Sequence, residues 1–297
     1  MKPLLQQIFE EQGYTIGKDL FLAFSPERVD PGNETYQTHN TPKVLGGVTP
    51  KCSEICEQIY KLAIDNIVLV SSARSAELVK IYENTFRSVN IALANEMVTI
   101  CNKLNVDVWE VIDAAATKPF GFMPFYPGPG LGGHCIPIDP SYLSWKLKSL
   151  DYDARFIALA DNVNSGMPNV VIEKVTSALN EHKKSINGSK VMIIGIAYKP
   201  NINDMRESPA IPIIQKLHQL GAELCFHDAL NPVFEKRYGL EMHSQDLSSE
   251  RLSEQDCVLI LTNHRGLPLD TLISHSKLIV DTRNATKSFD NPNIVTL

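Results

Sequence analysis

The sequence predicts an α/β protein in which a helical centre is followed by a parallel-sheet domain. Three observations carry this prediction. Residues 72–104 contain neither Gly nor Pro and repeat apolar residues at helical spacing. After residue 188, short apolar strands alternate with helical patterns, which is typical of a doubly wound parallel sheet. The first seventy residues consist of short α/β pieces that amount to half a sheet, so a partial α/β domain precedes the centre.

Residues 1–71 contain the elements of that partial domain. Helices are expected through Phe9 and after Pro50, and strands at 20–24, near Val44 and at 67–70. The chain begins within a helix, without an opening βαβ unit. We therefore expect the usual first part of this domain to be missing.

The centre, residues 72–187, is predicted to be helical. Ser71 or Ser72 is a suitable N-cap for a helix that runs to Leu104, about nine turns at 3.6 residues per turn. The apolar stripe of this helix starts at Leu78. Further helices are expected at 107–116, 141–150, 154–164 and 168–181.

The last part, residues 188–297, follows a polar stretch at 182–188. Strands are expected at 190–194, 223–226, 258–261 and 277–280, with a helix at 209–220. This alternation predicts a complete Rossmann-like domain with a parallel sheet.

Composition and charge exclude several classes of protein. The chain has 297 residues, 43% of them hydrophobic and 21% charged, with a formal net charge of −6. A disordered chain is excluded, and a sizeable core is expected. The mild acidic excess, without Lys/Arg-rich runs, gives no footprint for nucleic acid or an anionic membrane. No apolar run approaches the ~20 residues of a membrane helix, and we expect no secretion signal.

The six cysteines lack the dense spacing of a secreted disulfide scaffold, so we expect reduced thiols and a cytoplasmic protein. Cys52 and Cys56 lie at i and i+4 on a predicted helix but lack two further metal ligands. The eight histidines show no paired ligand spacing. We therefore predict no metal site and interpret His134 as a loop residue near a substrate.

The segment most informative about chemistry is 127–140, PGPGLGGHCIPIDP. Its glycines and prolines fix an irregular backbone whose bare amides can approach a ligand closely. It delivers Cys135 at a loop-to-helix junction, with Asp139 a few residues on, and a helix N-terminus there favours a thiolate. Cys135 is therefore a candidate nucleophile. The alternative is a buried structural cysteine beside a tight turn.

Two other segments place polar groups where a ligand can reach them. Lys80 and Asn84 lie at i and i+4 on the predicted long helix, so both can reach one pocket; a solvated surface lysine is the alternative. Glu27 follows a predicted strand, where ligands of open α/β sheets bind. A turn with a solvated carboxylate is the alternative for Glu27.

In the last domain, GIAYKP at 195–200 follows the first strand, and DMRESP at 204–209 leads into the next helix. A strand, a Gly turn and a helix N-terminus favour phosphate oxygens. A lone Gly is no GxGxxG fingerprint, so a tight turn with surface charges stays the alternative.

These motifs resemble those of the UDP-glucose/GDP-mannose dehydrogenase family, NAD-dependent enzymes that oxidise C6 of a nucleotide sugar twice, from alcohol to carboxylate. GGHCIPIDP at 132–140 is similar to the N-acetylhexosamine branch, and KPFGFMPFY at 118–126 to UDP-N-acetylglucosamine 6-dehydrogenases in particular. The resemblance covers essentially the whole chain. It implies oxidation of UDP-N-acetylglucosamine for polysaccharide biosynthesis, with UDP-N-acetylmannosamine or UDP-glucose as alternative substrates.

The resemblance also implies roles for the catalytic residues. Cys135 attacks an aldehyde intermediate to give a thiohemiacetal and then a thioester. Lys80 and Asn84 donate to the oxyanion at C6, while Glu27 and Asp139 position the hydrolytic water. Glucose-oxidising relatives carry a second acid four positions after this Glu.

That position is Pro31 here, so only Glu27 is carried over. Residues implied to bind the nucleotide sugar are Phe125, Tyr126, Gly130, Gly132, Gly133, Tyr198, Lys199 and Arg283. Arg206 is implied to reach the NAD diphosphate, and a homodimer through the central helical domain is expected. Many relatives lend an Arg near the active-site loop to the neighbouring subunit; no Arg matches it here, and Lys118 lies nearby.

The cofactor fingerprint is the exception to this resemblance. Family members carry GxGxxG in a domain of about 100 residues that precedes the point where this chain begins. We therefore expect residues 1–71 to be the C-terminal remnant of an NAD-binding domain, and little activity from this chain alone. A nucleotide-sugar binding module without catalysis is the alternative function. A purely structural dimerisation protein is disfavoured, because Lys80, Asn84, Cys135 and Asp139 occur together.

Overall fold

The computed structural model describes residues 2–30 and 33–297, and the chain separates into two compact units, Met1–Phe86 and Arg87–Leu297. The boundary between them falls inside a single long helix, α3 (Ala73–Leu104). The two units are described separately below. The three-part division at residues 71 and 187 stays a prediction.

The first unit is built on a small sheet with strand order β1-β2-β3. The central strand β2 pairs antiparallel with β1 and parallel with β3. The elements of the first unit before α3 are α1 (Lys2–Glu11), β1 (Ala23–Phe24), β2 (Lys43–Gly47), α2 (Pro50–Tyr60) and β3 (Ile67–Leu69). Each was expected from the sequence, but of the strand predicted at 20–24 only Ala23–Phe24 joins the sheet, while Leu20 forms an isolated bridge with Ile16.

Helix α3 is unbroken over 32 residues. It starts as predicted, because the Ser72 hydroxyl accepts the Ser75 amide at 3.1 Å, as an N-cap does. The apolar stripe that marks this helix in the sequence faces outward: Leu93 is 58% exposed and Leu104 67%. Large exposed apolar side chains on one helix face are a signature of an interaction surface.

Three more helices complete the helical part of the second unit, namely α4 (Val108–Ala116), α5 (Asp139–Lys148) and α6 (Arg155–Glu181). The prediction of two helices at 154–164 and 168–181 is wrong, because α6 continues through Pro168. Proline lacks the N–H that would bond to the carbonyl of Asn164. That carbonyl would lie 3.3 Å from a Cβ at Gly130, so the glycine-rich loop packs against the interrupted turn.

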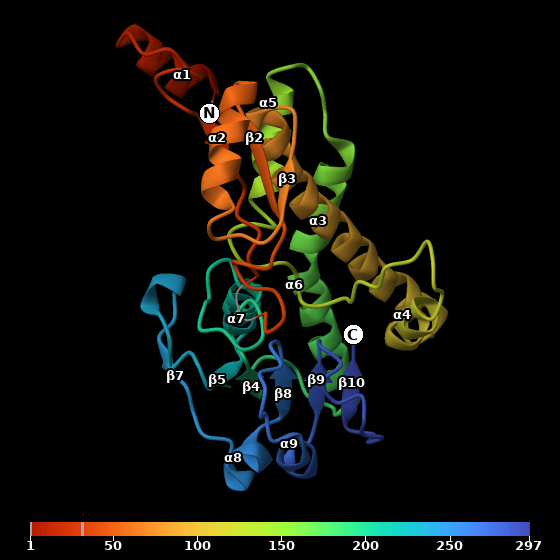
Figure 1. Cartoon of the computed structure of the whole chain (residues 1–297). Coiled ribbons are helices and arrows are strands. Elements are labelled where there is room, and N and C mark those ends of the chain that lie inside the picture. Colours follow the sequence, from red (N-terminus) through yellow and green to blue (C-terminus); the bar gives the residue numbers. More distant parts are fainter. Residues whose placement is uncertain (1, 31–32) are drawn as a thin grey trace. The chain divides into compact units, whose positions relative to one another are not determined.

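The second unit carries a five-stranded sheet with strand order β10-β9-β8-β4-β5, in which every neighbouring pair is parallel, as predicted (Figure 1). The strands are β4 (Lys190–Ile194), β5 (Glu223–His227), β8 (Cys257–Ile260), β9 (Ile279–Asp281) and β10 (Ile294–Thr296). The chain passes from β4 to β5 on one side and then returns to β8 on the other. The order therefore reverses at β4, which is the switch point where open α/β sheets bind ligands.

Alternate side chains of β4 bury opposite faces of this sheet. Val191 and Ile193 face the core that holds α6 and α7 (Ala210–Gln219), whereas Met192 and Ile194 face α8 (Ser249–Glu254) and α9 (Leu269–His275). A strand covered on both faces reads as a continuous apolar run, which explains its clear signal in the sequence.

The sequence analysis missed the short elements of this unit. These are α8, α9, β10, the antiparallel pair β6 (Val233–Phe234) and β7 (Met242–His243), and the 3-10 turn η1 (Lys236–Tyr238). Most span seven residues or fewer, which is too short for a period of two or 3.6 to show.

Candidate functional site

The glycine-rich loop packs directly on the segment that follows β4. A Cβ at Gly132 would lie 2.5 Å from Tyr198 Cβ and 2.9 Å from the Glu207 carbonyl oxygen. Gly133 has φ +79° and donates its N–H to the Arg206 carbonyl at 3.0 Å. The glycines thus permit a close approach of two chain segments, which brings the predicted loop and the predicted phosphate-binding segment together.

Arg283, which follows β9, contacts the start of the same loop at Gly128. Its Nη1 would be 2.5 Å from a Cβ at Gly128, and its Nε donates to the Leu261 carbonyl at 2.8 Å. Burial lowers the pKa of Arg283 to about 10, although Asp281 opposes this shift. The guanidinium is therefore still a cation at neutral pH, where it can pair with a phosphate.

Cys135 lies in the turn before α5, as predicted, and is partly exposed. Its carbonyl accepts the N–H of Asp139, the first residue of α5, at 2.9 Å. The pKa of Arg206 is raised, first by its hydrogen bonds to Asp204 and less strongly by the nearby Tyr198 and Cys135. The Gly133 bond to the Arg206 carbonyl, two residues before Cys135, brings the Cys135 turn close to the 204–206 segment.

The remaining thiols lack this setting. Burial raises the pKa of Cys56 and Cys225, and that of the fully buried Cys257 to about 12. Cys52 and Cys101 are buried, whereas Cys56 and Cys225 are partly exposed. Burial makes a thiol unreactive, and a raised pKa lowers the thiolate fraction of Cys56 and Cys225, so Cys135 is favoured as the nucleophile.

An open groove of about 720 Å³ runs beside the loop. Its lining includes Gly130 and His134 from the loop, three cations, Arg206, Lys216 and Arg237, and one carboxylate, Glu207. A groove with an excess of positive charge suits an anionic ligand.

Aromatic side chains fix the segment that leads into the loop. The Tyr126 ring stacks on Trp109 of α4 with centroids 6.0 Å apart, and its hydroxyl donates to Asp113 at 2.8 Å. Phe125 packs against the main core of this unit. The binding role predicted for Phe125 and Tyr126 stays a prediction, and the observed contacts anchor the segment to α4 and the core.

Two buried amides that the sequence analysis missed hold the loop from below. The Asn95 side chain accepts the Gly128 N–H at 3.0 Å and donates to Asn164 Oδ1 at 2.9 Å. Asn164 in turn donates to the Ser88 carbonyl at 3.1 Å. Asn95 is 0% exposed, so this network ties the loop to α3 and α6 without help from solvent.

In the first unit, Glu27 is held as a carboxylate. Its Oε1 accepts the backbone N–H groups of Arg28 and Val29, each at 2.8 Å. The pKa of Glu27 is lowered, first by the Val29 amide, while partial burial opposes the shift. A weakly basic carboxylate is suited to orienting a water molecule rather than to removing a proton from a weak acid.

The same segment is joined to α3 by an ion pair between Arg28 and Glu83 at 2.8 Å. Glu83 precedes Asn84, which is 3% exposed, and Lys80 one turn earlier is half-buried. Pro31, at the position where glucose-oxidising relatives carry a second acid, lies outside the described residues.

The catalytic residues expected from the sequence are divided between the units. Glu27, Lys80 and Asn84 belong to the first unit, and Cys135 and Asp139 to the second. Their convergence on one cleft stays a prediction.

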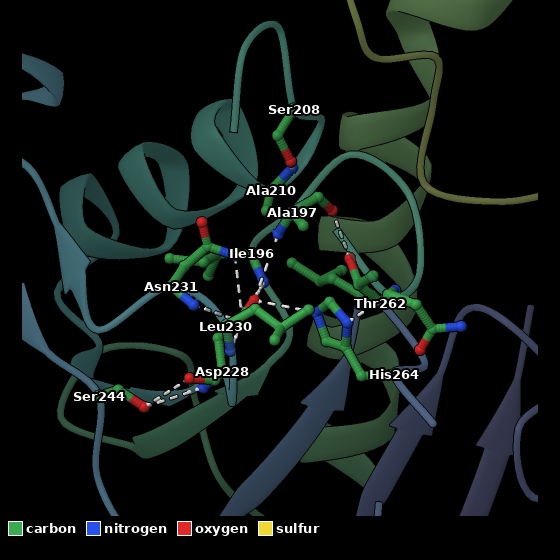
Figure 2. A network of polar contacts seen from close by, with 12 residues as sticks. Ile196, Ala197, Ser208, Ala210, Asp228, Leu230, Asn231, Ser244, Thr262 and His264 are labelled. Carbon is green, nitrogen blue, oxygen red and sulfur yellow. Dashed lines mark hydrogen bonds and ion pairs between the residues drawn. The ribbon is translucent and has the colours of Figure 1, made fainter. Parts of the chain in front are cut away.

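A second feature missed from the sequence is the polar cluster at the switch point of the sheet (Figure 2). Asp228, directly after β5, accepts the N–H groups of Ile196 at 2.8 Å and Ala197 at 3.4 Å through Oδ2. Its Oδ1 accepts the amides of Leu230 and Asn231, each at 2.9 Å. The chain's own carboxylate therefore occupies the amide nest in which a dinucleotide phosphate would bind.

The described residues contain no candidate metal site and no candidate membrane span. Within residues 2–30 and 33–297, no group of three or more His, Cys, Asp or Glu is arranged to hold a metal ion. Over that same described part of the chain, no helix has both the length and the apolar character that crossing a bilayer requires.

Comparison with known proteins decides the family. Residues 74–166 match the central domain of the UDP-glucose/GDP-mannose dehydrogenase family, and residues 192–288 match the UDP binding domain of the same family. UDP-N-acetyl-mannosamine dehydrogenase from Staphylococcus aureus is 33% identical with a TM-score of 0.78, and the match covers 99% of this chain and 67% of that one. The chain belongs to the UDP-glucose/GDP-mannose dehydrogenase family.

Two further relatives agree. A UDP-D-ManNAc dehydrogenase structure from Pyrococcus horikoshii has a TM-score of 0.85 at 27% identity, over 99% of this chain and 68% of that chain. NDP-N-acetyl-D-galactosaminuronic acid dehydrogenase from Ralstonia nicotianae is 37% identical over 268 residues, 89% of this chain and 61% of its own length. The chain thus spans about three fifths of the length of that curated relative.

Proposed function

We propose that this chain carries the nucleotide-sugar site and the cysteine nucleophile of a UDP-N-acetylhexosamine 6-dehydrogenase. The observation that carries the proposal is the packing of the Cys135 loop on the segment of Tyr198 and Arg206, through Gly132 and Gly133. This packing places a partly exposed thiol beside cationic groups suited to a diphosphate.

Each proposed step uses a group of the required type. The Cys135 thiolate adds to the carbonyl carbon of a C6 aldehyde, and the oxygen takes up a proton to form a thiohemiacetal. Loss of a hydride from C6 to the hydride acceptor named below, together with loss of the hydroxyl proton, then gives a thioester. Water hydrolyses the thioester to the carboxylate and returns the free thiol.

Residues of the first unit serve the same reaction in this proposal. Lys80 and Asn84 donate hydrogen bonds to the oxygen at C6 while it carries negative charge. Glu27, held as a carboxylate, and Asp139 orient the hydrolytic water.

NAD is proposed as the hydride acceptor of the whole enzyme, as in the dehydrogenases of this family. The amides of Ile196 and Ala197 donate to Asp228, so these two groups are not available to a diphosphate. Arg206 is the residue that we assign to the NAD diphosphate.

The sugar is proposed to be an N-acetylhexosamine. The resemblance of the segment at 118–126 favours UDP-N-acetylglucosamine as the substrate. The relatives above are named for N-acetyl-mannosamine and N-acetyl-galactosaminuronic acid. UDP-N-acetylmannosamine is therefore the second candidate, and direct comparison of the sugars decides between them.

A homodimer through the central helices and a cytoplasmic location are also proposed. Large apolar side chains are exposed on α3, α5 and α6 of the second unit, among them Leu93, Trp145 and Phe156, the last 76% exposed. Exposed apolar side chains of this size are stabilised by burial against a partner. The free cysteines suit a reducing compartment.

Addition of the Cys135 thiol to a C6 aldehyde can be tested without NAD, because no hydride is transferred in this step. A C6 aldehyde of each UDP-N-acetylhexosamine is added, and alkylation of Cys135 by iodoacetamide is followed by mass spectrometry. We expect the aldehyde to slow alkylation at least about tenfold more than the parent alcohol does, because only the aldehyde forms a covalent adduct.

Equal protection by alcohol and aldehyde would support the alternative, a binding module without catalysis. No protection by either would contradict the proposed site. The epimer that protects at the lowest concentration identifies the sugar.

A further inference from the structure

The polar cluster at the switch point contains a histidine that none of the motifs or mechanistic roles uses. His264, 8% exposed, lies after β8, and its Nε2 is 3.1 Å from Asp228 Oδ2 (Figure 2). Its Nδ1 is 3.0 Å from the backbone nitrogen of Asn201. The ring therefore bridges the chain after β5 and the loop after β4.

The hydrogen-bond partners fix the tautomer of this ring. A backbone N–H can only donate, so His264 Nδ1 must accept from Asn201 and carries no proton. The proton of the neutral ring is then on Nε2, where it is donated to Asp228. Burial alone would raise the pKa of Asp228, but the bonds from His264 and the amides hold it below its ordinary value, so the carboxylate stays ionised.

The residues 198–206, which we call the 198–206 loop, are closed at their base and held at Asn201. The Tyr198 N–H donates to the Asp204 carbonyl at 3.1 Å, which closes the loop. Asn201 has φ +63°, and its Oδ1 accepts the Arg265 N–H at 2.7 Å. The bonds to Arg265 and to His264 therefore both tie Asn201 to the chain that follows β8.

The opposite side of the 198–206 loop carries the groups assigned to the nucleotide. Tyr198 packs against Gly132 and Gly133, and the Arg206 carbonyl accepts the Gly133 N–H at 3.0 Å. Lys199 lies between Tyr198 and Asn201 in the chain. Asn201 is thus two residues from Lys199, within the loop that the Tyr198–Asp204 bond closes.

We propose that His264 is a positioning residue: it holds Asn201, and so sets the 198–206 loop in the conformation that binds the uridine diphosphate. Asp228 supports it by fixing the ring tautomer. This inference rests on the proposed function for its effect on affinity, but the hold on the loop itself does not depend on any ligand.

Two substitutions separate the two bonds of the ring. In His264→Asn the side-chain oxygen replaces Nδ1, so the acceptor for Asn201 is kept and the donor to Asp228 is lost. In His264→Gln the side-chain amide reaches the position of Nε2, so the donor to Asp228 is kept and the acceptor for Asn201 is lost. His218→Gln, at an exposed position of α7, is the matched control.

The experiment measures hydrogen exchange of the 198–206 peptide in the 297-residue chain, together with UDP affinity by calorimetry. We expect His264→Gln to speed exchange of this peptide about two- to tenfold, which is the effect of losing one net hydrogen bond. UDP affinity should fall by a similar factor. His264→Asn and His218→Gln should stay within about twofold of the parent chain in both measurements.

Unchanged exchange in His264→Gln, or equal acceleration in both His264 variants, would overturn the proposal, since either result means that the bond to Asn201 does not hold the loop. If His264→Gln fails to fold, exchange of the Asn201 amide proton itself is followed by NMR in the parent chain, because this proton is the one donated to His264 Nδ1. Protection of that proton supports the proposal, and exchange at the rate of an unprotected amide contradicts it. Failure of UDP to bind the parent chain would refute the proposed function, while the exchange data would still test the hold on the loop.

Discussion

Replacing Asn95 with alanine removes the amide that joins the glycine-rich loop at 127–140 to α3 and α6. The substitution leaves the Gly128 N–H and Asn164 Oδ1 without partners in a site that is closed to solvent. A buried polar group that loses its partner costs about 1–3 kcal/mol, so two such groups predict a loss of about 2–6 kcal/mol. A typical domain has only about 5–15 kcal/mol of stability, so the effect is large.

The assay is urea unfolding followed by circular dichroism, with Asn102→Ala as the control. Asn102 is exposed and accepts one bond from Lys174, so its loss should cost no more than about 0.5 kcal/mol. Asn164→Ala should cost less than Asn95→Ala, because the Ser88 carbonyl that it leaves is also part of a helix. A double-mutant cycle of Asn95 and Asn164 should give a coupling of about 0.5–3 kcal/mol. If Asn95→Ala is no more destabilising than Asn102→Ala, the network does not hold the loop and the reasoning fails.

Three further predictions follow from the contacts of single residues. Gly132→Ala should destabilise the chain by about 1–3 kcal/mol in thermal melts, because its Cβ collides with the segment after β4, whereas Gly166→Ala on α6, where nothing lies within 4 Å, should be neutral or stabilising. Iodoacetamide should label Cys135 well before the fully buried Cys257, and the reverse order by mass spectrometry would contradict the site. Asp228 has a lowered pKa in the folded state, so its contribution to stability is present above about pH 4 and is lost as the pH falls further. The Asp228→Asn variant should lack this contribution at every pH. Parallel acid-unfolding curves for the two chains would refute this prediction.

The regular elements could be predicted because their signals are local. The long stretch before Leu104 and the apolar strand at β4 have clear periods, and both form as expected. Pro168 misled the analysis because a proline usually ends a helix, whereas here the carbonyl that it frees packs against Gly130. Local rules carry no information about such a partner.

The network residues of the candidate site could not be predicted, because their partners are distant in the sequence. Asn95 and Asn164 are 69 residues apart, and Asp228 and His264 are 36 apart. One signal was available: Asp228 directly follows a strand of a parallel sheet, at the edge where polar residues gather. Its partner His264 becomes evident only when the strand order is known.

The exposed stripe of α3 shows a related limit. Helical periodicity identifies the apolar face from Leu78 to Leu104 but not what covers it. In the structure the buried face of this helix is made of small or polar residues, such as Ala94 and Asn95. Periodicity predicted the helix correctly, whereas the partner of its apolar face remains a proposal.

Binding of UDP-sugars to this chain tests the central claim most directly. Calorimetry and thermal melts are run with UDP, UDP-N-acetylglucosamine and UDP-N-acetylmannosamine on the parent chain, Lys199→Ala, Arg283→Ala and, as a surface control, Arg251→Ala. The account predicts binding, with stabilisation of about 2.7 kcal/mol at a hundredfold excess over Kd. Affinity should fall about tenfold or more in the Lys199 and Arg283 variants but not in the control, because each loses charged hydrogen bonds to phosphate. No binding of any uridine nucleotide to the parent chain, or equal binding to all variants, would contradict the account.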